Sequence, residues 1–60
     1  MKIVIGMYDF EIDDVGNIHI YETRNNRRRY FDMLRTNTQL LENQFRKKCK
    51  DWYFENVIAL

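Results

Sequence analysis

Residues 8–22, with the sequence YDFEIDDVGNIHIYE, alternate apolar and polar side chains on both sides of a central turn. An alternation with a period of two is typical of a β-strand that buries one face. A type I turn closed by glycine fits Asp14–Gly16, because glycine enters the left-handed region without a steric cost. The stretch therefore predicts a β-hairpin.

The turn also predicts the register of that hairpin. It places Phe10 opposite Ile20 on an apolar face and Glu11 opposite His19 on a polar face. Apolar side chains then meet apolar side chains, which a shift by one residue would destroy.

Residues 2–7 are rich in β-branched side chains and extend the first strand towards the N-terminus. The apolar positions change from odd to even numbers across Gly6, which predicts a bulge or bend there. We therefore expect residues 1–23 to form a two-stranded antiparallel hairpin.

The second half of the chain has the apolar spacing of an amphipathic helix. Either Asn25 or Asn26 can cap its start. Residues 36–38 are three poor helix formers in a row, so one helix could end there and a second could begin. We predict one helix over residues 25–55, and a tail over residues 56–60 that is either a fraying turn or a short C-terminal strand. The apolar side chains recur at intervals of four and seven: Tyr30, Leu34, Leu41, Phe45 and Trp52.

These elements predict a single small α+β domain over residues 1–60, with a two-stranded antiparallel β-hairpin packed on one long C-terminal helix (ββα). Such a helix would be on the order of 43 Å long, whereas a hairpin strand of ten residues spans about 33 Å. Part of the apolar stripe should then extend past the sheet. This overhang and the small core predict a homodimer or another constitutive complex.

Composition excludes several classes of site. The chain has one cysteine, one histidine and no serine, so an internal disulfide, a structural zinc site and a serine nucleophile are all excluded. We expect no enzyme activity, no cofactor and no metal. The absence of a long apolar run or a signal peptide predicts no membrane span and a cytoplasmic location, in a host cell if the protein is viral.

Charge is distributed unevenly along the chain. Residues 1–23 carry one basic and five acidic side chains, and residues 24–50 carry nine basic and two acidic ones. Either the two halves face one another, or the basic half binds an acidic partner. The candidate partner-binding residues are arginines, lysines and neighbouring aromatic residues, in two groups: Arg24, Arg27, Arg28, Arg29 and Tyr30, then Arg46, Lys47, Lys48, Trp52, Tyr53 and Phe54.

Arginine and aromatic side chains are the usual hot spots of protein interfaces. We therefore predict a small non-enzymatic regulator or inhibitor that binds a protein, of the kind that bacteriophages direct against host enzymes or defence systems. The alternative is a small nucleic-acid-binding transcriptional regulator that uses the basic clusters Arg24–Arg29 and Arg46–Lys50, because basic and aromatic side chains together also suit nucleic acid.

Overall fold

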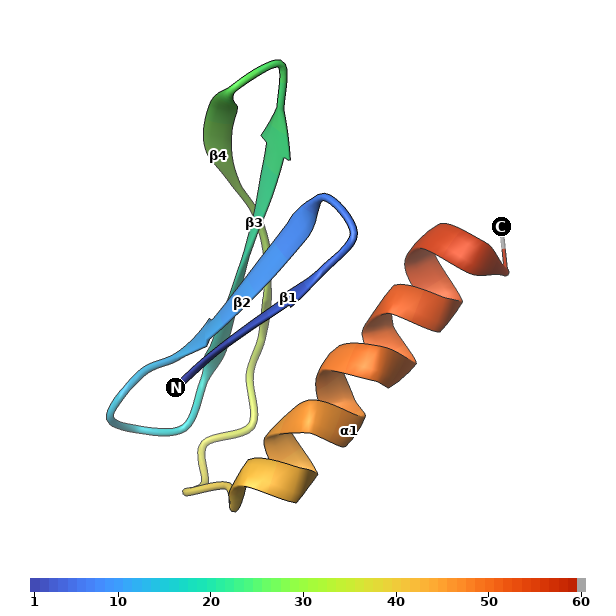
Figure 1. Ribbon diagram of the computed structural model, residues 1–60. Helices are drawn as coiled ribbons and strands as arrows, with labels where there is room; N and C mark the ends of the chain where they lie inside the picture. Colours follow the sequence, from blue (N-terminus) through green and yellow to red (C-terminus); the bar gives the residue numbers. More distant parts are fainter. Residues whose placement is uncertain (60) are drawn as a thin grey trace.

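The fold is a four-stranded antiparallel sheet followed by one helix, in a computed structural model that describes residues 1–59. The strands lie in the sheet in chain order: β1 (Lys2–Ile5), β2 (Tyr8–Ile12), β3 (Ile18–Arg24) and β4 (Arg27–Leu34). The helix α1 (Glu42–Tyr53) ends in one π-helical segment, η1 (Phe54–Ile58). In Figure 1, α1 runs along one side of the sheet, and the β3–β4 hairpin extends beyond the β1–β2 turn.

The predicted register of the central hairpin is confirmed. Phe10 pairs with Ile20, and Glu11 pairs with His19. Gly16 has a φ of 96° in the turn, and a Cβ atom there would lie 1.7 Å from the backbone oxygen of Thr38. Glycine is thus required both by the turn and by the loop that passes against it.

The bulge or bend predicted at Gly6 within a single strand is instead a turn between two strands. Gly6, with a φ of 59°, and Met7 form a two-residue turn, so the first strand is in fact two strands. β1 folds back on β2 and pairs Ile3 with Phe10. The change from odd to even apolar positions marks a reversal of the chain.

The prediction of a two-stranded hairpin on a long helix over residues 25–55 is also wrong. Asn25 and Asn26 have φ values of 54° and 61°, which suit a two-residue hairpin turn and not the start of a right-handed helix. The chain therefore reverses here, and residues 27–34 pair with β3 as the fourth strand.

An irregularity between Ile20 and Tyr21 explains why the apolar spacing was misleading. Tyr30 pairs with Tyr21, and Leu34 pairs with Ile18. The four-residue interval between Tyr30 and Leu34 thus belongs to an irregular strand pair and not to a helical turn.

The weak segment at residues 36–38 lies in the loop between β4 and α1, where Asn37 has a φ of 54°. The helix begins after Leu41, whose backbone N–H donates to the Gln44 side-chain oxygen at 2.9 Å.

The predicted C-terminal strand is wrong for residues 56–58, which belong to η1. Leu60 lies outside the described residues.

The core lies between α1 and one face of the sheet. Phe45, Cys49 and Trp52 of the helix are buried against the strands, where Phe10 and Ile20 are fully buried. α1 has 12 residues and η1 adds 5, so the helical segment is about 25 Å long and not about 43 Å, which removes the argument for an overhanging apolar stripe. None of the helices formed by residues 1–59 has the length and apolar character needed to cross a bilayer.

Candidate partner-binding surface

The first predicted basic cluster lies on the β3–β4 hairpin and is divided between the two faces of the sheet. Arg28 points to the face opposite α1, where it meets Asp9 and Glu11 of β2. Arg24 and Arg29 lie on the helix side, where both form ion pairs with Glu22. This division follows from the alternation of side chains along a strand.

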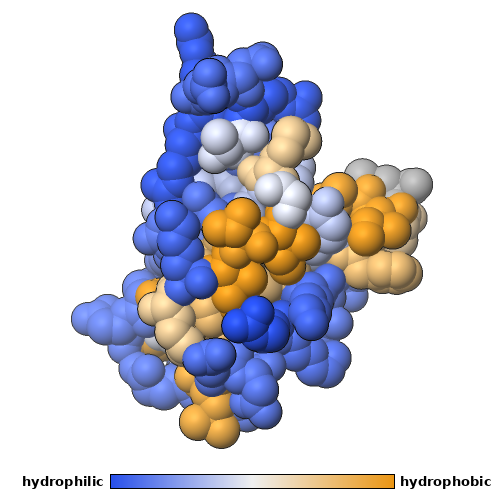
Figure 2. Space-filling model, viewed as in Figure 1, coloured by the Kyte–Doolittle hydropathy of each residue, from blue (hydrophilic) through white to orange (hydrophobic). Residues whose placement is uncertain are grey.

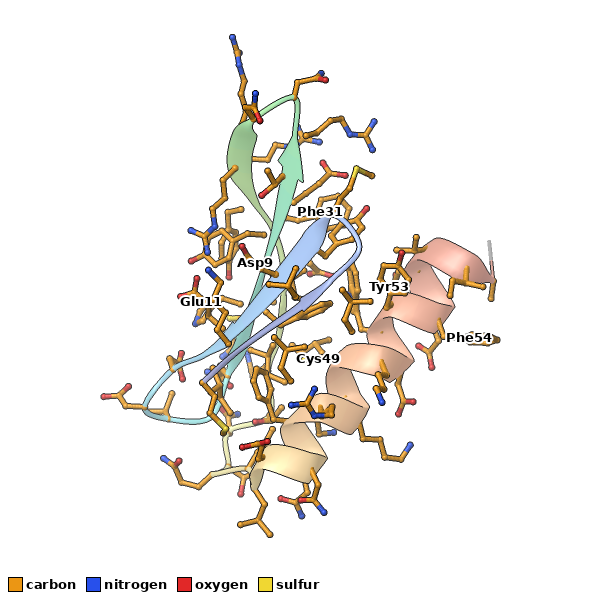
Figure 3. The ribbon with its side chains drawn as sticks, viewed as in Figure 1. Asp9, Glu11, Phe31, Cys49, Tyr53 and Phe54 are labelled. Carbon is orange, nitrogen blue, oxygen red and sulfur yellow. The ribbon has the colours of Figure 1, made fainter. Side chains whose placement is uncertain are left out.

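Arg28 is held by contacts within the chain. Its Nε and Nη2 atoms donate to Asp9 at 3.1 and 3.0 Å, Nη2 also donates to Glu11, and the guanidinium lies 3.7 Å from the centre of the Tyr21 ring. The hydrogen bond to Asp9, with the two carboxylate charges, raises the pKa of Arg28 above its ordinary value. Figure 3 shows Asp9 and Glu11 on the side of the sheet away from α1. The uneven charge is predicted to mean either that the two halves of the chain face one another or that the basic half binds an acidic partner. The pairing of Arg28 with Asp9 and Glu11 agrees with the first of these.

Glu22 is the centre of the arginine group on the helix side. Its side chain is only 4% exposed, and it accepts hydrogen bonds from Tyr8 at 3.2 Å, from Arg24 at 3.2 Å and from Arg29 at 3.3 Å. Burial acts to raise the pKa of Glu22, but the Tyr8 hydrogen bond and the charges of Arg24 and Arg29 outweigh it, so the pKa lies below its ordinary value. Glu22 therefore stays ionised and fixes two guanidinium groups at the surface.

These arginines line a hollow of about 570 Å³ near the hairpin tip, together with Glu22, Asn25 and Arg27. The side chains of Arg24 and Arg29 are 62% and 73% exposed despite their shared partner. Arg27 is exposed and forms no ion pair within residues 1–59. Three guanidinium groups thus lie around one carboxylate that pairs with only two of them, which leaves an excess of positive charge.

Phe31 adds an aromatic side chain next to the arginines. The irregularity in the β3–β4 pairing brings its ring against Tyr8 at 5.4 Å and Trp52 at 5.9 Å between centroids, while 45% of the residue stays exposed. Arg27 and Arg29 precede Phe31 at alternate positions of β4. We use the name arginine surface for Arg24, Arg27, Arg29 and Phe31.

Of the second predicted group, on α1 and η1, only Trp52 is shown in contact with the arginine surface, through the Phe31 ring. Arg46 and Lys47 form ion pairs one turn along the helix, with Glu42 at 3.5 Å and Asp51 at 2.9 Å. Lys48 lines a separate hollow of about 320 Å³ between the end of β4 and the helix. Trp52 is a core residue and donates from Nε1 to Asp32 at 3.2 Å.

Tyr53 and Phe54 point in different directions, as expected for neighbours on a helix. Tyr53 faces the sheet, where its ring lies 6.1 Å from that of Tyr8, and Phe54 points away from it (Figure 3). Phe54 and Ile58 are 57% and 61% exposed. Figure 2 shows the apolar surface that gathers at this end of the helix.

The remaining reactive groups are engaged inside the fold. His19 lies with Nε2 2.7 Å from Asp13 and with Nδ1 2.8 Å from the Tyr30 hydroxyl. The His19 hydrogen bond lowers the pKa of Asp13 below its ordinary value. Burial raises the pKa of the Cys49 thiol to about 12. Within residues 1–59, no group of three histidine, cysteine or acidic side chains is placed to hold a metal ion.

Sequence reasoning missed Phe31 as a member of the arginine surface and Glu22 as the carboxylate that fixes two of its arginines. The signal that could have found them is the Asn25–Asn26 pair, which is a hairpin turn signal when strand-forming residues flank it. A hairpin there would have placed Arg29 opposite Glu22.

The chain matches no protein-family model, no curated protein and no solved structure. The function of the arginine surface is therefore argued from the chemistry of its side chains.

Proposed function

We propose that this chain is a small non-enzymatic regulator that binds a protein partner through the arginine surface. The observation that carries this proposal is the exposure of Arg27, Arg29 and Phe31 at alternate positions of one open strand. Arginine and aromatic side chains contribute most binding energy in protein interfaces. Phe54 and Ile58 offer an additional apolar contact at the end of the helix.

The non-enzymatic part of the proposal rests on the state of the two groups best suited to nucleophilic or acid–base chemistry. Cys49 is buried with a pKa of about 12, so almost none of it is thiolate at neutral pH. His19 already has both ring nitrogens within hydrogen-bond distance of Asp13 and Tyr30.

A nucleic-acid-binding regulator is the second candidate, favoured by Arg27 at the tip of a two-stranded hairpin that extends beyond its neighbours (Figure 1). Two observations weigh against it. Arg24, Arg28 and Arg29 already pair with carboxylates, and the isoelectric point of about 7.9 lies below the range typical of nucleic-acid-binding domains.

Two further predictions stay untested. That the regulator is a bacteriophage inhibitor of a host enzyme or defence system follows only from its size and composition. The prediction of a homodimer is no longer supported by an overhanging helix and rests only on the small size of the core.

Capture from a nuclease-treated lysate of the source cell tests the proposed function. We expect a protein to be retained by the wild-type chain and lost with Arg27→Glu, because that change replaces the arginine without an ion pair by an acidic side chain and removes the excess positive charge of the surface. Lys50→Glu is the matched control, since it makes the same charge change on the exposed side of α1. Capture that disappears on nuclease treatment would contradict the proposal and favour the nucleic-acid candidate.

A further inference from the structure

The two edges of the sheet differ in how far they are open. β1 is a four-residue edge strand that contacts α1. β4 is an eight-residue edge strand, and its first six residues are all exposed. Every second residue of an edge strand directs its backbone N–H and C=O outward, where no neighbouring strand accepts them. The outer side of β4 is therefore the longer open template for a further strand.

The side chains of β4 restrict which strand can be added. Like charges directly opposite one another are destabilising, so a basic strand is disfavoured beside Arg27 and Arg29. Opposite charges at the same positions are stabilising. Arg27 has no carboxylate partner within residues 1–59, and Arg29 shares one with Arg24.

The two faces of the added strand are not equivalent. On the face away from α1, Arg28 is already paired with Asp9 and Glu11, so a further acidic side chain has little to gain there. On the helix side, two arginines are followed at the next alternate position by the exposed ring of Phe31. The complementary strand carries acidic residues at alternate positions and then an apolar residue on that same face.

We propose that β4 takes up an extended acidic segment of the partner protein as a fifth antiparallel strand. This mode is β-strand addition, in which backbone hydrogen bonds contribute affinity and alternate side chains contribute specificity. The inference rests on the proposed function, and it adds that the bound segment of the partner is acidic and extended.

The test is an NMR titration of the full chain with the blocked peptide Thr-Leu-Thr-Glu-Thr-Glu-Thr. In antiparallel pairing, its leucine meets Phe31 and its glutamates meet Arg29 and Arg27. We expect chemical-shift changes along residues 27–32 and slower exchange of the outward-facing amides there, and neither effect along β1. Replacing both glutamates with glutamine should weaken binding about ten-fold or more, because two charge-assisted contacts are lost.

Variants of the chain and of the peptide backbone separate charge from strand pairing. Arg27→Gln should weaken binding about five-fold, which one surface ion pair can supply, whereas Lys50→Gln should leave it unchanged. A peptide methylated on the backbone nitrogens that face β4 should not bind. Circular dichroism checks that each variant stays folded.

Three results of the peptide titration would overturn the inference. The glutamine peptide could bind as well as the glutamate peptide, the shift changes could fall outside β4, or an oligonucleotide could displace the peptide from β4. Protection of the outward-facing β4 amides in the peptide-free chain, with a dimer in sedimentation, would also overturn it and assign the edge to a second copy. A captured protein whose complex leaves β4 exchange unchanged would refute this inference and leave the proposed function standing. Loss of capture on nuclease treatment would refute the proposed function itself.

Discussion

Glu22 is the residue on which the arginine surface depends. It is almost fully buried, yet it bonds to Tyr8 and to two arginines whose side chains remain exposed. A buried carboxylate costs free energy unless its oxygens are hydrogen-bonded, and Glu22 meets that condition. Glu22 is thus a positioning residue for the arginines, and we expect it to affect stability and partner binding together.

The ionisation of Glu22 predicts a loss of stability in acid. Its pKa is lower in the folded chain than in the unfolded one, so its contribution is complete above the unfolded pKa of about 4.3 and is lost as pH falls through the folded pKa. Asp13, whose pKa is also lowered, acts in the same direction. We expect the urea midpoint to fall between about pH 5 and pH 3. Glu22→Gln should remove part of this dependence, and an unchanged profile would contradict the assignment.

Cys49 is expected to be inert in the folded protein. Its side chain is fully buried, and burial raises its pKa to about 12. A thiol reagent should therefore modify it only as fast as the chain opens, with a rate that increases with urea. Fast modification of the native protein at pH 8 would show that the helix does not cover this thiol.

At the scale of elements, the turn at Asn25–Asn26 decides whether residues 27–34 are a strand. Asparagine tolerates positive φ better than most residues do. Replacing Asn26 with alanine should cost about 1 kcal/mol in the free energy of unfolding, because alanine is strained at positive φ. Asn26→Gly is the control that keeps this φ accessible. Urea unfolding measures both, and equal stabilities for the two variants would contradict the turn geometry.

The same turn separates the part of the fold that the sequence predicts from the part that it does not. The β2–β3 register was predictable because alternation and a glycine turn agree over Tyr8–Glu22, and the helical spacing from Phe45 to Trp52 is confirmed by their burial on one face of α1. β4 was not predictable in this way, because Asn25–Asn26 suits a helix cap as well as a hairpin turn. The basic candidates were recognised by type, but their grouping depends on long-range pairs such as Arg28 with Asp9, which local patterns do not reveal.

At the scale of the whole molecule, one helix on one face of a sheet gives a small core with one layer of contacts. Phe45 is fully buried and Phe54 is 57% exposed, although both lie in the same continuous helical segment. Phe45→Ala should cost about 3–5 kcal/mol in the free energy of unfolding. Phe54→Ala should change it by less than about 0.5 kcal/mol. Comparable losses for both variants would show that the outer side of the helix is covered, for instance by a second chain.

The order of the strands has a consequence for how the chain folds. Each strand pairs with the next one along the chain, through two-residue turns at Gly6–Met7 and Asn25–Asn26, so the sheet forms by closing short loops. Only the helix must return to β1 across most of the chain, and its docking is the step with the largest loop to close. We expect the sheet to form ahead of the helix, because short loops cost less entropy to close than the long one. Trp52, the only tryptophan, lies at the interface between the two and reports that last step by its fluorescence.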